Sequence, residues 1–92
     1  MIESFKHKGL KRLFEEDDRS KLAADLVEKI RLILSALEEA GSIDDLNQPS
    51  FRPHRLKGDL KGYWAVTVRA NWRIIFRFEE GEASNVDLVD YH

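Results

Sequence analysis

The sequence predicts an α+β domain in which two N-terminal helices pack on a small antiparallel β-sheet. Two observations predict this class. Apolar residues recur at helical spacing within residues 1–40, and they alternate at strand spacing between residues 63 and 88. The chain has 92 residues, of which 42% are hydrophobic and 10% aromatic. This is enough for one apolar core, so we expect a single domain over residues 1–92.

The first part of the chain predicts a short strand and a short helix. Residues 2–5 alternate weakly and are expected to form the strand. Leu10, Leu13 and Phe14 follow at the i, i+3, i+4 spacing of an amphipathic helix, which we place over residues 7–16.

A second, longer helix is predicted after the polar break at residues 17–20. Its one-sided apolar stripe runs from Leu22 to Leu37, and we expect the helix to end near Ala40. Ser20 is the expected N-cap, and Gly41 is the residue expected to stop the helix.

Three strands are predicted in the second half of the chain. Residues 63–69, 72–78 and 83–88 alternate in polarity, with turn residues between them at Ala70–Asn71 and Glu80–Gly81. Such closely connected strands predict an antiparallel meander.

The alternation also assigns the two faces of the predicted sheet. We expect the helices to cover one face, whose members are Trp64, Val66, Val68, Trp72, Ile74, Phe76 and Phe78. Arg69, Arg73 and Arg77 then share the open face with Tyr63. For Tyr63, stacking on a base and a purely structural role are equally supported.

Charge is unevenly distributed, although the net charge is only −2. Residues 49–78 carry a net +6, whereas residues 1–48 carry −3 and residues 79–92 carry −5. We name residues 49–78 the basic segment. A local field of this strength favours a phosphate-bearing partner over a merely solubilising surface.

Several classes of function are excluded or disfavoured by composition and motifs. The chain has no cysteine, no glycine-rich phosphate loop and no histidine pair at metal-binding spacing, so we expect no metal and no cofactor. It shows neither an apolar signal segment nor a run long enough to cross a membrane, and we therefore expect a cytoplasmic protein with no membrane partner.

Histidines and cations in the second half of the chain suit cleavage of RNA without a metal. His54 lies within the basic segment, and residues 90–92 combine a carboxylate, a phenol and an imidazole directly after the last predicted strand. Cleavage needs a base, an acid and cations for the extra phosphate charge. Histidine supplies the first two near neutral pH, and arginine or lysine supplies the third.

A family resemblance makes this hypothesis specific. The sequence resembles the HigB-type toxins of the RelE/ParE superfamily at residues 2–10 and at four later motifs, which are LKGD at 56–59, GYW at 62–64, VRANWRI at 68–74 and DYH at 90–92. The resemblance is weakest from Asp17 to Ser50.

The resemblance implies a RelE-like fold and a toxin that cuts messenger RNA in the ribosomal A site. It implies attack by the 2′-hydroxyl on the adjacent phosphate, without a metal. It also implies a helix-turn-helix antitoxin of the HigA type as the partner, with the toxin–antitoxin complex bound to operator DNA.

By position, the resemblance assigns roles to individual residues. The expected catalytic residues are His54, Lys57, Arg73, Asp90, Tyr91 and His92. Here the two histidines are the acid and the base in either order, and Lys57 and Arg73 stabilise the phosphate. The residues expected to bind RNA are Arg55, Lys61, Tyr63, Arg69 and Arg77.

One departure from the family pattern affects His54. Pro53 precedes this histidine, whereas relatives commonly have a proline after it. We expect Pro53 to hold Arg52 in an extended conformation, which leaves the path of the loop at His54 open.

Two other functions remain open at this stage. A toxin of the ParE kind has the same fold and poisons DNA gyrase without a catalytic tail, so the DYH motif argues against it. A non-catalytic RNA-binding module would use the basic segment only to hold phosphate.

Overall fold

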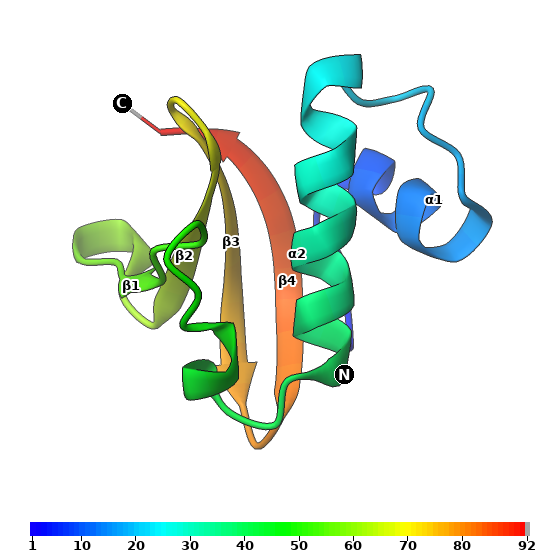
Figure 1. The fold of residues 1–92 in the computed structure, drawn as a ribbon. Coiled ribbons are helices and arrows are strands. Elements are labelled where there is room, and N and C mark those ends of the chain that lie inside the picture. The colour runs from blue at the N-terminus through cyan, green and yellow to red at the C-terminus, as the bar shows by residue number, and fades with distance from the viewer. Residues whose placement is uncertain (92) are drawn as a thin grey trace.

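The fold, seen in a computed structural model that describes residues 1–91, is a four-stranded antiparallel sheet with helices on one face (Figure 1). The strands lie in sequence order: β1 (His54–Arg55), β2 (Tyr63–Arg69), β3 (Trp72–Glu79) and β4 (Glu82–Asp90). The helices are α1 (Lys8–Glu16) and α2 (Val27–Glu39). Three short 3₁₀ turns are η1 (Ala24–Leu26), η2 (Ile43–Leu46) and η3 (Gly58–Leu60). The α+β class is confirmed, but β1 was not predicted and the strand predicted at residues 2–5 is not one of the four.

The main core lies between α2 and the sheet. Ile30, Ile33, Leu34 and Leu37 from α2 are buried against residues from β2, β3 and β4, which are Val66, Val68, Ile74, Phe76, Ala83 and Val86. Leu10 and Leu13 extend this core to α1. The predicted helix-covered face of the sheet is therefore confirmed for its central residues.

The second helix begins later than predicted. Ser20 is not its N-cap, because the Ser20 N–H donates to Asp18 Oδ1 at 2.9 Å within a turn. The pKa of the Asp18 carboxyl is lowered, first by its hydrogen bonds with Ser20 and then by Arg12. Leu22 remains in the loop, where it still packs against the core, and α2 starts at Val27 after η1.

The helix ends close to the predicted residue, but the interaction at its end differs from the predicted one. Ala40 leaves it in an extended conformation, and Gly41 is not among the glycines with positive φ. Instead, the Gly41 N–H donates to Asp45 Oδ2 at 2.8 Å.

The predicted first strand lies beside β4 without forming a regular strand. Parallel bridges join Ile2 to Ala83 and Phe5 to Val86. Asn85, between them, has a positive φ of 53°, and the register of β4 shifts there. This irregular edge limits the pairing to two separate bridges.

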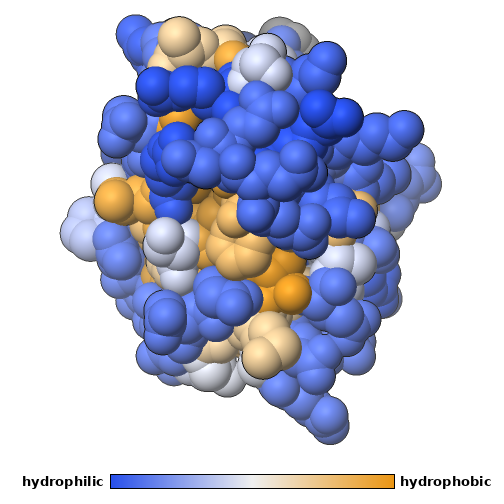
Figure 2. All heavy atoms as spheres, turned by 90° about the vertical axis from the view of Figure 1, so that its right-hand side faces the viewer, coloured by the Kyte–Doolittle hydropathy of each residue, from blue (hydrophilic) through white to orange (hydrophobic). Residues whose placement is uncertain are grey.

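The surface over the two helices holds a shallow apolar hollow. Its volume is about 260 Å³, and it is lined by Leu13, Phe14, Arg31, Leu34 and Ser35. Figure 2 shows apolar side chains gathered at the centre of this side, bordered by hydrophilic ones. Within residues 1–91, no helix has the length and apolar character needed to cross a bilayer.

Candidate active site

The sheet face away from α2 is partly covered, which the sequence did not predict. Strand register places Ala65 opposite Ile75 and Thr67 opposite Arg73 on this face. Leu56, which follows β1, packs on Ala65 and Ile75, and these three residues are buried as a second small cluster. Only the ends of this face therefore remain accessible.

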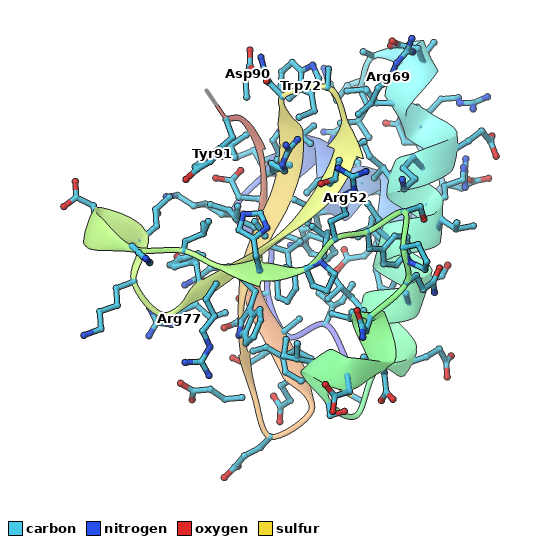
Figure 3. All side chains as sticks on the ribbon, turned by 60° about the vertical axis from the view of Figure 1, so that its left-hand side comes forward. Arg52, Arg69, Trp72, Arg77, Asp90 and Tyr91 are labelled. Carbon is cyan, nitrogen blue, oxygen red and sulfur yellow. The ribbon has the colours of Figure 1, made fainter. Side chains whose placement is uncertain are left out.

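A β-bulge moves Arg69 to the other face. The register shifts between Thr67 and Arg69, so that Arg69 pairs with Trp72. Its guanidinium Nη1 lies 3.0 Å from Asp25 Oδ2, at the start of the helix layer (Figure 3). The prediction that Arg69, Arg73 and Arg77 share one surface is therefore wrong for Arg69.

Arg73 is held at the end of the sheet where β2 turns into β3. Its Nη1 donates to the carbonyl oxygens of Ala70 and of Trp72, the latter at 3.1 Å. Its Nε–H is buried and has no hydrogen-bond partner among residues 1–91. Hydrogen bonds from a guanidinium to an anionic oxygen are strong, so an arginine anchored by two carbonyl oxygens is suited to hold a phosphate with its remaining N–H groups.

His54 is placed on the edge strand, facing the same side as Ala65. It pairs with Ala65 in β1, and its Nδ1 lies 3.2 Å from the Arg52 carbonyl oxygen. Because a carbonyl only accepts, Nδ1 carries the proton in this contact and Nε2 is the basic nitrogen. The loop expected at His54, whose path the sequence left undetermined, is instead a short strand.

The chain reaches β1 through an anchored but unusual turn. Phe51 is buried, and its carbonyl oxygen accepts the Thr67 N–H at 2.7 Å. Arg52 has a positive φ of 47°, so the extended conformation expected from Pro53 is wrong. The burial of Phe51 and the pairing at Thr67 fix the backbone more strongly than the local preference before proline.

The end of β4 lies beside the turn between β2 and β3. Asp90 pairs with Trp72, and the Tyr91 N–H donates to the Asn71 carbonyl oxygen at 2.7 Å. Figure 3 shows Trp72, Asp90 and Tyr91 at this end of the sheet. Trp72 is 36% exposed, so its predicted place in the core is wrong. His92 lies outside the described residues.

Asn71 has a structural role at this end of the sheet that the sequence did not predict. We interpreted it only as turn chemistry, whereas its carbonyl oxygen holds the backbone of Tyr91. Its place within the VRANWRI motif was the available signal.

The remaining predicted RNA-binding residues lie toward the opposite end of the sheet. Tyr63 pairs with Arg77, whose guanidinium lies 5.4 Å from the Tyr63 ring centroid. Arg77 lies four positions after Arg73 along β3, which corresponds to about 13 Å. Lys57 and Lys61 flank η3 and are exposed, and Arg55 lies over the Trp64 ring at 5.0 Å.

The predicted site therefore divides into two groups. Arg73, Asp90 and Tyr91 lie at one end of the sheet, with His54 on the neighbouring edge strand. Tyr63, Lys61 and Arg77 lie at the other end, where Arg55 and Lys57 adjoin them. Within residues 1–91, no three histidine or acidic side chains gather in a way that holds a metal ion.

The chain is similar to known toxins over nearly its whole length. The model of the HigB-like toxin family, RelE-like toxins of the type II toxin–antitoxin system HigB, matches residues 3–92. Endoribonuclease HigB of Proteus vulgaris is 50% identical over 92 residues, which is 100% of both chains. Toxin HigB-1 of Vibrio cholerae is 33% identical over 90 residues, covering 96% of this chain and 95% of its own.

Solved structures of other toxins share the fold. YafQ from Escherichia coli has a TM-score of 0.63 at 18% identity, covering 98% of this chain and 91% of its own. The heterotetrameric YoeB–YefM toxin–antitoxin complex from Staphylococcus aureus has a TM-score of 0.62 at 18% identity, covering 100% and 95%.

Proposed function

This chain belongs to the HigB-like toxins of type II toxin–antitoxin systems, and from that membership we propose that it is an endoribonuclease that cuts messenger RNA and so inhibits translation and growth. The finer proposal is that it cuts in the ribosomal A site, at codons being translated. The relative that is 50% identical over the whole chain is named an endoribonuclease, which supports the activity.

The observation that carries the proposed mechanism is the setting of Arg73. Its guanidinium is anchored by two carbonyl oxygens and keeps a buried Nε–H donor, at the end of the sheet where β4 finishes. We propose that the Arg73 guanidinium stabilises the extra negative charge of the phosphate as it is attacked, and that the exposed Lys57 side chain reaches the same phosphate from the group at the other end of the sheet.

The reaction proposed for this site is transfer of a phosphate within the RNA. The ribose 2′-oxygen loses its proton to a base and bonds to phosphorus, while the bond to the 5′-oxygen breaks and that oxygen gains a proton from an acid. His54 Nε2 is suited to accept or return a proton. His92 is proposed as the second histidine, with Asp90 and Tyr91 orienting it or the RNA.

The proposed partners follow from the family. An antitoxin is supported by the type II family, and we propose a helix-turn-helix protein of the HigA type whose complex with the toxin binds operator DNA. The other proposed partners are the small ribosomal subunit and its mRNA, and with them we propose a cytoplasmic location.

Translation in a purified bacterial system, with the mRNA mapped by primer extension, tests the proposal. Cuts aligned with codons, and absent when ribosomes are omitted, are expected. Arrested DNA supercoiling by gyrase without cuts would instead select the ParE-like function. The absence of both effects would select a non-catalytic RNA-binding module.

A further inference from the structure

A pocket beside the edge strand shares one residue, Lys57, with the proposed mechanism. Its volume is about 470 Å³, within the range of small-ligand sites. Successive side chains of a strand point to opposite faces, so Arg55 faces Trp64 while His54 faces Ala65. Arg55 and Trp64 line the pocket from one side of the edge strand, and Leu56 and Tyr63 line it from the other, so the pocket extends around the end of β1.

The pocket combines aromatic walls with cations. Tyr63, Trp64 and Phe78 contribute rings that are only partly buried. Arg55, Lys57 and Lys61 contribute charge, and no lining residue among residues 1–91 is acidic. The lack of acidic lining residues does not follow from the overall composition, because the chain has 17 acidic and 15 basic residues in total.

These two features fit one ligand chemistry. An unpaired nucleotide is flat and apolar at its base and anionic at its phosphate. Bases stack on aromatic rings and on guanidinium planes, and lysines hold the phosphate. The Arg55 guanidinium lies over the Trp64 ring, 5.0 Å from its centroid, so a base that enters here meets both a guanidinium and an aromatic ring.

We propose that this pocket binds the base of an unpaired nucleotide of the RNA substrate, next to the nucleotide that is cut. The inference rests on the proposed function and adds a second contact with the RNA, beside the proposed site of cleavage. His54 and Arg55 are neighbours in β1, so RNA that crosses this edge strand passes both side chains. Lys57 lines the pocket and is also proposed to hold the scissile phosphate, which connects the two sites.

Recognition by stacking predicts a particular kind of selectivity. Every base has an aromatic face, so the pocket accepts all four bases and favours those that stack most strongly. A preference for purines at one position beside the cut is therefore expected.

Fluorescence of Trp64 tests the pocket directly. The chain has two tryptophans, so Trp72→Phe leaves Trp64 as the single reporter. The probe is a six-nucleotide RNA with 2′-O-methyl groups, which block attack by the 2′-oxygen. We expect saturable quenching of Trp64, and about tenfold weaker binding when one particular position of the probe lacks its base.

Two matched lysine variants supply the control. Lys61→Gln is expected to weaken binding and to lower the slope of log Kd against log salt by about 0.7, the value of one single-strand phosphate contact. Lys11→Gln removes an equally exposed lysine from α1 and should change neither quantity. Equal effects of the two variants would overturn the pocket as the binding site.

Three further outcomes would overturn the inference: no quenching, quenching that is indifferent to the removal of any base, or equal quenching by a polyglutamate peptide. The peptide result would assign the pocket to an acidic protein segment instead. Codon-aligned cuts in the translation assay, without quenching of Trp64, would refute only the proposal that the pocket binds a base. Quenching without any cuts would refute the proposed cleavage and would support RNA binding in the pocket.

Discussion

At the scale of single residues, the arginines of the basic segment differ in what holds them. Arg69 pairs with Asp25 on the helix side, and Arg77 and Arg55 lie over aromatic rings. Arg73 is held by backbone carbonyl oxygens and keeps a buried Nε–H donor. This difference makes Arg73 the cation best placed for a phosphate.

Arg73→Ala is expected to lower mRNA cleavage about 10²–10³-fold, because a preorganised donor to developing charge is lost. The fold should persist, because Arg73 does not belong to either buried cluster. Primer extension gives the cleavage, and thermal melting gives the stability. Lys11→Ala removes an exposed positive charge elsewhere, and comparable loss of cleavage in that variant would contradict a specific role for Arg73.

His92→Gln is expected to lower cleavage about 10²–10⁴-fold, the usual contribution of a general acid or base. The comparison is His7→Gln, since His7 Nδ1 accepts the Leu10 N–H at the start of α1. Loss of that cap should lower stability by about 1 kcal/mol without affecting cleavage. If both variants cut RNA equally well, the catalytic interpretation of His92 is wrong.

At the scale of elements, the sequence was informative wherever a pattern was long. The alternation over residues 63–69 and 72–78 predicted β2, β3 and the turn between them. β1 has two residues, too few for a pattern, and it exists because β2 offers a free edge. The bulge at Thr67 and Arg69 also cannot be read from the alternation of polarity, yet it reverses the direction of Arg69 and therefore removes this arginine from the predicted site.

The turn between η3 and β2 requires a glycine. Gly62 has a φ of +95°, and an added Cβ would lie 3.1 Å from Arg77 Nη2. Gly62→Ala is expected to lower the free energy of unfolding by about 1–3 kcal/mol, measured with urea. At Gly41 the nearest atom to an added Cβ is Asp45 Oδ2 at 3.6 Å, so Gly41→Ala should cost less. Equal losses would show that the backbone of Gly62 is not constrained.

The contact between the N-terminal segment and β4 should depend on pH. A hydrogen bond with the Glu82 carboxyl, and then its charge, raise the pKa of Glu3. A raised pKa in the folded state stabilises the protein below the ordinary pKa of glutamate, and this stability is lost as pH rises through the raised value.

Glu3→Gln is therefore expected to raise the free energy of unfolding at neutral pH, and to raise it less at about pH 4. Urea unfolding at both pH values measures this. Glu15→Gln, on α1, serves as the control for loss of a negative charge. A gain for Glu3→Gln that does not depend on pH would refute the carboxyl pair.

At the scale of the whole molecule, the two sides of the sheet carry different surfaces. The helix side presents the apolar hollow between α1 and α2, bordered by hydrophilic residues (Figure 2). The predicted catalytic residues that the structure describes, and the aromatic pocket, lie around β1 and the ends of the sheet, where the basic segment is exposed. The basic segment predicted a phosphate-binding region from charge alone, whereas its division into two groups required the strand register.

The central claim is that this chain cuts RNA by attack of a ribose 2′-hydroxyl, and the chemistry of the cut ends tests it most directly. The mRNA fragments from the purified translation system are expected to carry a 2′,3′-cyclic phosphate and a 5′-hydroxyl. A single 2′-deoxynucleotide on the 5′ side of the cut should abolish that cut and leave neighbouring ones. Fragments with a 3′-hydroxyl and a 5′-phosphate, or cutting that persists at the 2′-deoxynucleotide, would contradict the account.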